Sequence, residues 1–303
     1  MDSKLFDPAV PVIVQGITGR AGRTHAQLMQ RYGTHVVGGV ATYASASREP
    51  VAGIPVFASC REAVAETGAR ASLLMVPPLN VLPAVEDALA GGVELLVCIT
   101  EGVPVHDALK LVPMVRDHGA VLIGPSTPGI AVPGRMKIGF LPDAALMPGP
   151  LGVISKSGTL SYEICYRLAQ RGVGQSLWIG CGGDAVKGAR FADLVPLFQS
   201  HADTEALLVI GEIGGTEEEE LADALIRERF SKPVFALLAG TTAPEGVTMG
   251  HAGALIHSTR GTAASKVAAL TAAGVRVHAM MRDIVEDAGR LLAPAAPIAQ
   301  SPL

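Results

Sequence analysis

Short apolar segments alternate with amphipathic segments along almost the whole chain, and this alternation constrains the fold more than any other feature of the sequence. In the first half, the apolar segments have the length of strands and the amphipathic segments have the apolar spacing of helices. Because a strand, a helix and a second strand in succession form a right-handed crossover, the pattern predicts a parallel sheet covered by helices. The strands are expected at residues 10–15, 36–40, 73–76, 95–100 and 121–123, and the helices at 23–30, 61–66, 81–90 and 108–117.

A second series of the same kind follows a proline-rich interval. Between residues 124 and 150 the periodicity fades and prolines accumulate, and proline interrupts both helices and strands. We therefore expect two α/β domains, a Rossmann-type domain at residues 1–147 and a second domain at residues 148–303. In the second domain the strands are expected at residues 152–155, 176–179, 206–210, 234–238 and 275–277, and the helices at 159–170, 191–199, 217–227, 263–273 and 284–292.

The composition excludes several classes of partner. The 24 Lys and Arg residues against 28 Asp and Glu residues give a net charge of -4 without a basic stripe, so no nucleic acid is expected. No apolar run approaches the ~20 residues that cross a bilayer, which predicts a cytoplasmic protein without a membrane partner. The cysteines form no metal-ligand spacing, so we expect buried free thiols and no metal site. They are Cys60, Cys98, Cys165 and Cys181.

A glycine-rich turn follows the first expected strand. It reads Gly16-Ile-Thr-Gly19-Arg-Ala-Gly22 and opens a helix, where free backbone amides favour a phosphate, although a tight corner without a ligand has the same sequence. An NAD site needs an acidic residue about 20 positions further on. The second strand instead ends in uncharged residues at 40–43, and the loop continues to Arg48. These residues favour a ligand with a ribose phosphate, CoA or NADP, over NAD.

Two further strand ends carry residues suited to ligands. Ser155-Lys-Ser157-Gly-Thr159 places small residues at a helix start, which fits either a phosphate site or an ordinary capped helix. Glu212 follows the strand expected at 206–210 and has glycines on both sides, at the strand edge where ligands gather in open α/β sheets; a helix-capping carboxylate or a surface charge is the alternative. The acidic run at 217–220 follows Thr216, and we expect it to be a solvated helix start.

The most informative histidine is His251, in the segment Met249-Gly-His-Ala-Gly253. An imidazole between small residues on a glycine-rich loop has little core to fill and is free to move. This setting favours a reactive side chain over a structural one. His257 lies nearby without such neighbours and is the weaker candidate.

Together these segments resemble the alpha subunit of succinyl-CoA synthetase, also called succinate–CoA ligase. The matching stretches follow the family's order over nearly the whole chain, at residues 15–19, 32–34, 37–40, 99–102, 137–139, 157–160, 162–163, 211–215 and 249–253. The resemblance implies a Rossmann-type CoA-binding domain followed by a flavodoxin-like domain that carries a phosphohistidine loop. It also implies a separate beta subunit with an ATP-grasp fold, which holds ATP or GTP with Mg, and this chain indeed has no GxxxxGK[ST] segment of its own.

The resemblance also assigns roles to residues. The implied reaction forms succinyl-CoA, or the CoA ester of a related dicarboxylic acid, through a phosphohistidine and an acyl phosphate, as in the tricarboxylic acid cycle. The implied catalytic residues are His251 and Glu212. CoA contacts are implied for Gly16, Thr18, Gly19, Arg20, Ala21, Ile99, Thr100 and Glu101, phosphate contacts for Ser157, Gly158 and Thr159, and positions near the acyl substrate for Tyr162 and Ser126.

The sequence departs from the family pattern in four places. The loop after the second strand is longer and offers Ala44 where the family has a CoA-binding lysine, so we expect Arg48 to replace that lysine. Ser126 and Thr127 stand where the family has Asn and Cys, Cys181 replaces an isoleucine, and the basic residues that usually precede Met-Gly-His are missing.

These departures leave alternatives open. A ligase for malate or another dicarboxylate shares the same motifs. A non-catalytic CoA-binding or nucleotide-binding Rossmann protein is the alternative from another class. The sequence also leaves open the choice of ATP or GTP and whether assembly stops at a heterodimer.

Overall fold

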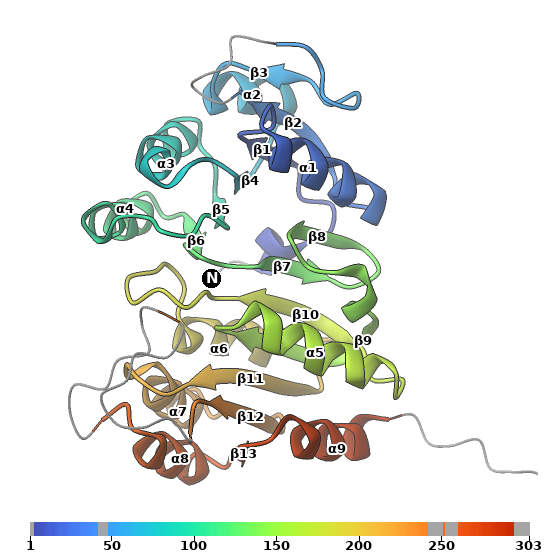
Figure 1. The fold of residues 1–303 in the computed structure, drawn as a ribbon, viewed down its shortest axis with the longest axis vertical. Coiled ribbons are helices and arrows are strands. Elements are labelled where there is room, and N and C mark those ends of the chain that lie inside the picture. Colours follow the sequence, from blue (N-terminus) through green and yellow to red (C-terminus); the bar gives the residue numbers. More distant parts are fainter. Residues whose placement is uncertain (1–2, 42–47, 242–250, 252–259, 294–303) are drawn as a thin grey trace, which may run out of the picture.

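The computed structural model describes residues 3–41, 48–241, 251 and 260–293, and Figure 1 shows them as two α/β units stacked along the long axis of the molecule. The first unit contains a parallel sheet in the order β3-β2-β1-β4-β5-β6. This order is that of a Rossmann-type sheet, as predicted. Its strands are β1 (Val12–Gln15), β2 (Val36–Val40), β3 (Val56–Phe57), β4 (Ala71–Leu74), β5 (Leu95–Cys98) and β6 (Val121–Ile123), and its helices are α1 (Arg20–Tyr32), α2 (Cys60–Thr67), α3 (Val81–Ala90) and α4 (Val105–Asp117).

Helix α1 is bounded by a glycine at each end. Helix α1 begins three residues earlier than expected, because Gly19 takes an extended conformation at its N-cap directly after the turn. It ends at Gly33, which adopts a left-handed conformation with φ 110°. Strand β3 was not predicted, since two residues are too short to show a period.

The second unit contains a sheet in the order β13-β12-β11-β9-β10-β7-β8. Its parallel part, β10-β9-β11-β12-β13, has the strand order of flavodoxin-like folds, in agreement with the expected fold. The parallel strands are β9 (Pro148–Ser155), β10 (Gln175–Gly180), β11 (Ala206–Glu212), β12 (Val234–Ala239) and β13 (Arg276–His278). The helices are α5 (Gly158–Ala169), α6 (Phe191–Ser200), α7 (Glu217–Arg227), α8 (Ala263–Ala272) and α9 (Met281–Leu292).

The proline-rich interval contains a β-hairpin that the fading periodicity did not predict. Its strands are β7 (Gly129–Val132) and β8 (Met136–Gly139), and β7 pairs with β10 in antiparallel orientation. The chain therefore changes sheet between Ile123 and Gly129, whereas the expected domain boundary lies at residues 147/148. Figure 1 shows β7 and β8 lying between the two units.

Apolar side chains join the two units. One core cluster includes Val14 of β1, Ile130 of β7 and Val209 of β11. The four cysteines are free and buried, which confirms that prediction. Among the described residues, no helix is both long and apolar enough to cross a membrane.

Candidate active site

The turn between β1 and α1 is shaped by its glycines. Gly16 has φ 81°, and a Cβ added there would overlap the carbonyl oxygen of Met75. A Cβ on Gly22 would overlap the carbonyl of Gly16, so the turn closes tightly onto the first turn of the helix. Thr18, Gly19, Arg20 and Ala21 remain at least partly accessible at the carboxyl end of the strand. The turn therefore leaves the start of α1 accessible at this edge of the sheet.

The loop after β5 lies at the same edge of the sheet, because β1, β4 and β5 are neighbouring parallel strands. Ile99 is buried, Thr100 is half-buried and Glu101 is exposed. The Thr100 hydroxyl donates to the carbonyl of Val76 at 2.8 Å, and the Ser126 amide donates to the carbonyl of Thr100 at 3.0 Å. The structure thus brings the expected substrate residue Ser126 against the expected CoA-contacting loop.

Arg48 lies at the start of the segment that leads to β3. Its guanidinium is exposed and lies 3.2 Å from the carboxylate of Glu62, on α2. The preceding residues of this loop, Ala44 among them, lie outside the described residues. The described contacts of Arg48 leave part of its guanidinium available to a phosphate.

The expected phosphate cradle lies between β9 and α5. Ser157 caps the helix, and its hydroxyl accepts the amide of Leu160 at 3.3 Å. Gly158 and Thr159 form the first positions of the helix, where backbone amides lack partners in the same helix. The Tyr162 hydroxyl lies directly over Gly158, 3.2 Å from where a Cβ would stand. Burial raises the pKa of Tyr162 to about 12, so this hydroxyl remains a hydrogen-bond donor at neutral pH.

His251 meets Glu212 across a long stretch of sequence. The Nδ1 atom of His251 lies 2.6 Å from Oε2 of Glu212, which ends β11. This hydrogen bond raises the pKa of His251 above its ordinary value, and partial burial opposes the rise. On the other side, the ring packs so closely on Gly183 that an added Cβ would overlap it. The two residues expected to be catalytic are therefore in direct contact. His257 lies outside the described residues.

A carboxylate that the sequence did not single out lies between the two units. Burial raises the pKa of Asp184, and the nearby Glu101 raises it further, whereas Lys187 and His251 act in the opposite direction. Asp184 and Glu212 line a cavity of about 200 Å³ together with Lys156 and Lys187. Asp184 thus lies within electrostatic range of both Glu101, at the end of the expected CoA loop, and His251.

The acidic run at 217–220 is not a solvated helix start, which corrects that expectation. Glu217, Glu218 and Glu219 are buried, and only Glu220 is partly exposed. Glu217 and Glu218 pair with buried lysines that come from separate segments of the chain. Lys187 lies 2.7 Å from Glu217, Lys156 lies 2.8 Å from Glu218, and Lys266 also pairs with Glu218.

These lysines were not predicted from the sequence as members of the site. Lys156 stands inside the Ser-Lys-Ser-Gly segment, and its position directly after a buried strand was the available signal. Lys187 and Lys266 follow no recognisable local pattern. Among the residues that the structure describes, no group of acidic, histidine or cysteine side chains is arranged to hold a metal ion.

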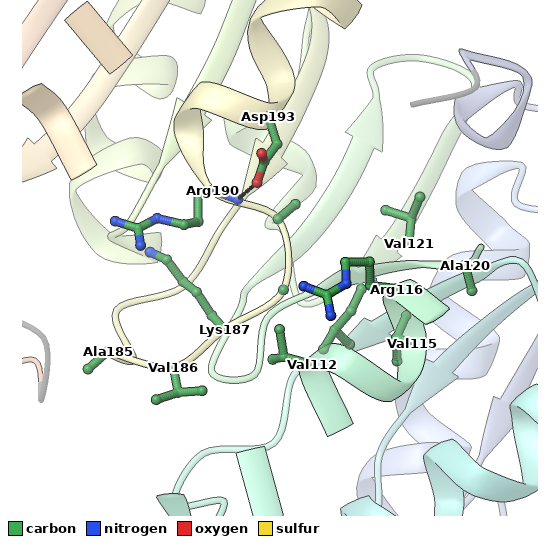
Figure 2. A pocket seen from close by; sticks show the side chains of 13 residues that line it. Val112, Val115, Arg116, Ala120, Val121, Ala185, Val186, Lys187, Arg190 and Asp193 are labelled. Carbon is green, nitrogen blue, oxygen red and sulfur yellow. Dashed lines mark hydrogen bonds between the residues drawn. The ribbon is translucent and has the colours of Figure 1, made fainter. Parts of the chain in front are cut away.

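An open groove of about 520 Å³ adjoins the cavity (Figure 2). Its walls are α4 with the start of β6 on one side and the segment 185–193 on the other. Lys187 and Arg190 line both the groove and the cavity. The amides of Gly188 and Ala189 donate to carbonyls of the first unit, at Gly124 and Leu122, at 2.8 and 2.7 Å. The loop that carries Lys187 is therefore anchored to the edge of the first sheet.

Comparison with known proteins gives a family match in each of the two units. The family model described as the CoA binding domain matches residues 8–102, and the one described as CoA-ligase matches residues 154–276. The alpha 1 subunit of ADP-forming succinate–CoA ligase from Archaeoglobus fulgidus is 46% identical over 288 residues, which cover 95% of this chain and 98% of that protein. The malate–CoA ligase alpha subunit of Methylorubrum extorquens is 42% identical over 279 residues, 91% of this chain and 93% of that protein.

A solved structure shares the fold. It is the ATP citrate lyase of Methanosaeta concilii, with a TM-score of 0.87 and 23% identity, covering 96% of this chain. This chain spans about half the length of that protein, 51%. The extent and level of identity to the curated ligase subunits place the chain in a family: it belongs to the succinate–CoA ligase alpha subunits.

Proposed function

We propose that this chain is the alpha subunit of a nucleoside-triphosphate-dependent ligase that joins succinate, or a related dicarboxylic acid, to coenzyme A through a phosphohistidine at His251. The 2.6 Å contact between Nδ1 of His251 and Oε2 of Glu212 carries this proposal. A carboxylate on Nδ1 favours the tautomer with the proton on that nitrogen. The lone pair of Nε2 is then free to act as a nucleophile.

The first step is transfer of a phosphoryl group to His251. Nε2 attacks the γ-phosphorus of the nucleotide, a nitrogen–phosphorus bond forms, the bond to the bridging oxygen breaks, and the nucleoside diphosphate leaves. Glu212 stabilises the positive charge that develops on the ring. The amides of Gly158 and Thr159, at the start of α5, suit the phosphoryl oxygens as electrostatic partners, whereas the amide of Ser157 already donates to Oγ of Ser155 at 3.0 Å.

Two further steps complete the reaction. A carboxylate oxygen of the acid attacks phosphorus, the nitrogen–phosphorus bond breaks, and an acyl phosphate forms while the ring returns to neutral. The sulfur of CoA then attacks the acyl carbonyl, the bond to the phosphate breaks, and the thiol proton leaves with the phosphate. The Tyr162 hydroxyl, a donor beside Gly158, and Ser126 are suited to hold the acid in these steps.

Coenzyme A is proposed to bind at the carboxyl edge of the first sheet. The turn at Gly16, with Thr18 to Ala21, and the loop with Ile99, Thr100 and Glu101 meet at that edge. Arg48 is proposed to hold the ribose phosphate. The position of Asp184, within electrostatic range of both Glu101 and His251, supports a path for the thiol end of CoA towards the second unit.

The nucleotide is proposed to lie on a beta subunit with an ATP-grasp fold. That subunit would hold ATP or GTP with Mg, whose charge would assist departure of the diphosphate. Free, buried cysteines are typical of a reducing compartment, which supports a location in the cytoplasm.

The test is phosphorylation of the chain co-expressed with an ATP-grasp chain from a neighbouring reading frame. With γ-labelled ATP, we expect an acid-labile, base-stable label that is absent from the His251→Asn variant. Labelling that persists in His251→Asn, or CoA binding without any label, contradicts the proposal and favours a non-catalytic CoA-binding protein. Turnover with succinate, malate and other dicarboxylates then identifies the acid.

A further inference from the structure

The backbone of Glu212 is held on both sides by a buried ion pair. Oε1 of Glu218 accepts the amide hydrogen of Glu212 at 3.1 Å, and Nζ of Lys266 donates to the carbonyl of Glu212 at 2.8 Å. Glu218 and Lys266 are fully buried, each 0% exposed, and they are ion-paired to each other. The residue that presents its carboxylate to His251 is thus fixed at both of its own peptide groups.

Lys266 also links the strand to the helix that follows the histidine loop. Its Nζ donates to the carbonyl of Gly214 at 2.6 Å, and the amide of Gly214 donates to the carbonyl of Gly261 at 2.8 Å. Gly261 directly precedes Thr262, the N-cap of α8, and α8 carries Lys266. One ammonium group therefore connects the end of β11 with the segment that leaves the loop of His251.

A glycine next to Glu212 leaves room for this ion pair. A Cβ on Gly211 would overlap Oε1 of Glu218, so a bare position next to Glu212 admits the carboxylate. Burying two charges costs several kcal/mol in desolvation, and an apolar pair of similar volume often stabilises a fold equally well. Fold stability therefore does not explain why this buried pair is charged, whereas control of the position of Glu212 does explain it.

We propose that Glu218 and Lys266 are positioning residues that hold the backbone of Glu212 so that its carboxylate accepts the Nδ1 proton of His251. They act through Glu212, and they keep Nε2 directed at the phosphoryl donor. This inference rests on the proposed function for its catalytic consequence, since it assumes that His251 is the nucleophile. The geometric part, control of the contact between Glu212 and His251, can be measured without turnover.

The first experiment is an NMR titration of the His251 ring in the full chain, assigned with His251→Asn. Lys266→Met removes the ammonium group and retains its volume. If Glu212 loses its position, the carboxylate raises the pKa of His251 less, so the titration midpoint moves to lower pH. Loss of a nearby positive charge acts in the opposite direction, because it favours the protonated ring. A shift to lower pH therefore distinguishes positioning from a simple charge effect.

The charged groups that face His251 come from several elements, and none of them is removed in this variant. Glu212 ends β11, Lys156 follows β9, and Asp184 and Lys187 lie in the loop after β10. A second variant, Glu218→Met with Lys266→Met, removes both charges of the pair. It tests the positioning role in the case that Lys266→Met alone does not fold. It loses both backbone bonds of Glu212 and also the partner of Lys156, whose charge lowers the pKa of His251, so the midpoint is expected to fall at least as far.

Lys232 provides a matched control. Its Nζ donates to two backbone carbonyls, those of Phe198 and His201, at 2.7 and 2.8 Å, away from Glu212. Lys232→Met should leave the His251 midpoint unchanged. In a Glu212→Gln background, Lys266→Met should cause no further shift to lower pH, because the carboxylate that it positions is already gone and only the charge effect, which raises the midpoint, remains. An unchanged or raised midpoint in Lys266→Met, or an equal shift in the Glu212→Gln background, overturns the proposal.

The second experiment measures phosphorylation of His251 in the complex with the beta subunit. We expect Lys266→Met to slow phosphorylation about 10- to 100-fold, as displaced supporting groups commonly do. Lys232→Met should retain the wild-type rate. If the wild-type chain takes up no label, the proposed function fails while the NMR titration still decides the positioning role. If labelling is normal in Lys266→Met, the catalytic part of the inference is wrong and the proposed function stands.

Discussion

Nδ1 of His251 and Oε2 of Glu212 lie 2.6 Å apart although the two residues are 39 positions apart in the chain. The carboxylate raises the pKa of the imidazole, so the neutral ring, which is the proposed nucleophile, becomes dominant only above that raised pKa. The rate of phosphorylation should therefore increase with pH across the titration of His251.

Glu212→Gln should change both the rate and its pH dependence. The amide does not stabilise the imidazolium, so we expect phosphorylation to slow about 10²- to 10³-fold. The pKa of His251 falls towards its ordinary value, so the rising limb of the profile moves to lower pH. Single-turnover labelling between pH 5 and 9 measures both effects. A profile that keeps its wild-type midpoint contradicts the role of Glu212.

Gly183 leaves room for the imidazole, which permits a steric test. The backbone conformation of Gly183 is one that any residue can adopt. A Cβ there would nevertheless overlap the ring of His251, so Gly183→Ala should displace the ring from Glu212. We expect phosphorylation to fall about 10-fold or more with little change in thermal stability. Gly289→Ala is the control, since a Cβ there meets only ordinary contacts at 3.6 Å, and normal labelling of Gly183→Ala would show that the ring takes another position in solution.

The periodicity of the sequence predicted both sheets because buried parallel strands and their covering helices each follow a local pattern. The interval around β7 and β8 was missed, since a short hairpin rich in proline and glycine shows no alternation of its own. Its strands exist because β10 offers a free edge to pair with. Such tertiary pairing is invisible to any rule that reads one segment at a time.

The candidate site was likewise predicted only in part from the sequence. His251 and Glu212 were predicted from their motifs, and the structure brings them into contact. The burial of the acidic run was missed because a helix start is a favourable place for solvated carboxylates. Glu217 is buried only because Lys156 and Lys187, from two other segments, meet it there. The charge partners of a buried residue depend on the complete fold.

The pair formed by Lys187 and Glu217 should stabilise the fold in a pH-dependent manner. The lysines hold the pKa of Glu217 below its ordinary value, despite burial. The contribution of Glu217 to the free energy of unfolding is therefore complete above its unfolded pKa of about 4.3. This contribution is lost as the pH falls through the folded pKa. Urea unfolding at a series of pH values should show a smaller loss of stability on acidification for Glu217→Gln than for the wild-type chain.

The losses of stability caused by removing the two partners of this pair should not add. Lys187→Met leaves Glu217 buried beside Lys156 alone, at 3.4 Å, and we expect a loss of about 3–5 kcal/mol in the free energy of unfolding at pH 7. The double variant with Glu217→Leu should lose less than the sum of the two single variants. Additive losses would show that Lys187 and Glu217 do not interact in solution.

Arg48 is expected to hold a phosphate of CoA. Arg48→Ala should weaken CoA binding about 10-fold, which corresponds to one charge-assisted hydrogen bond. Calorimetric titration with CoA measures the change, and Arg61→Ala, an exposed arginine on α2, serves as the control for general surface charge. Equal affinities of Arg48→Ala and the wild-type chain would exclude Arg48 as a replacement for the family's lysine.

Cys98 provides a probe of the CoA-binding edge because it ends β5 next to Thr100. Burial raises the pKa of the Cys98 and Cys165 thiols to about 12, so iodoacetamide at pH 8 should label them only when the chain opens. Desulfo-CoA, which lacks a thiol, should slow labelling of Cys98 about 100-fold at 100 times its dissociation constant if that opening disrupts the site. Cys165 lies on α5, outside this edge, and its labelling should slow less. Equal protection of both cysteines, measured by mass spectrometry, would instead mean that each is exposed only by global unfolding.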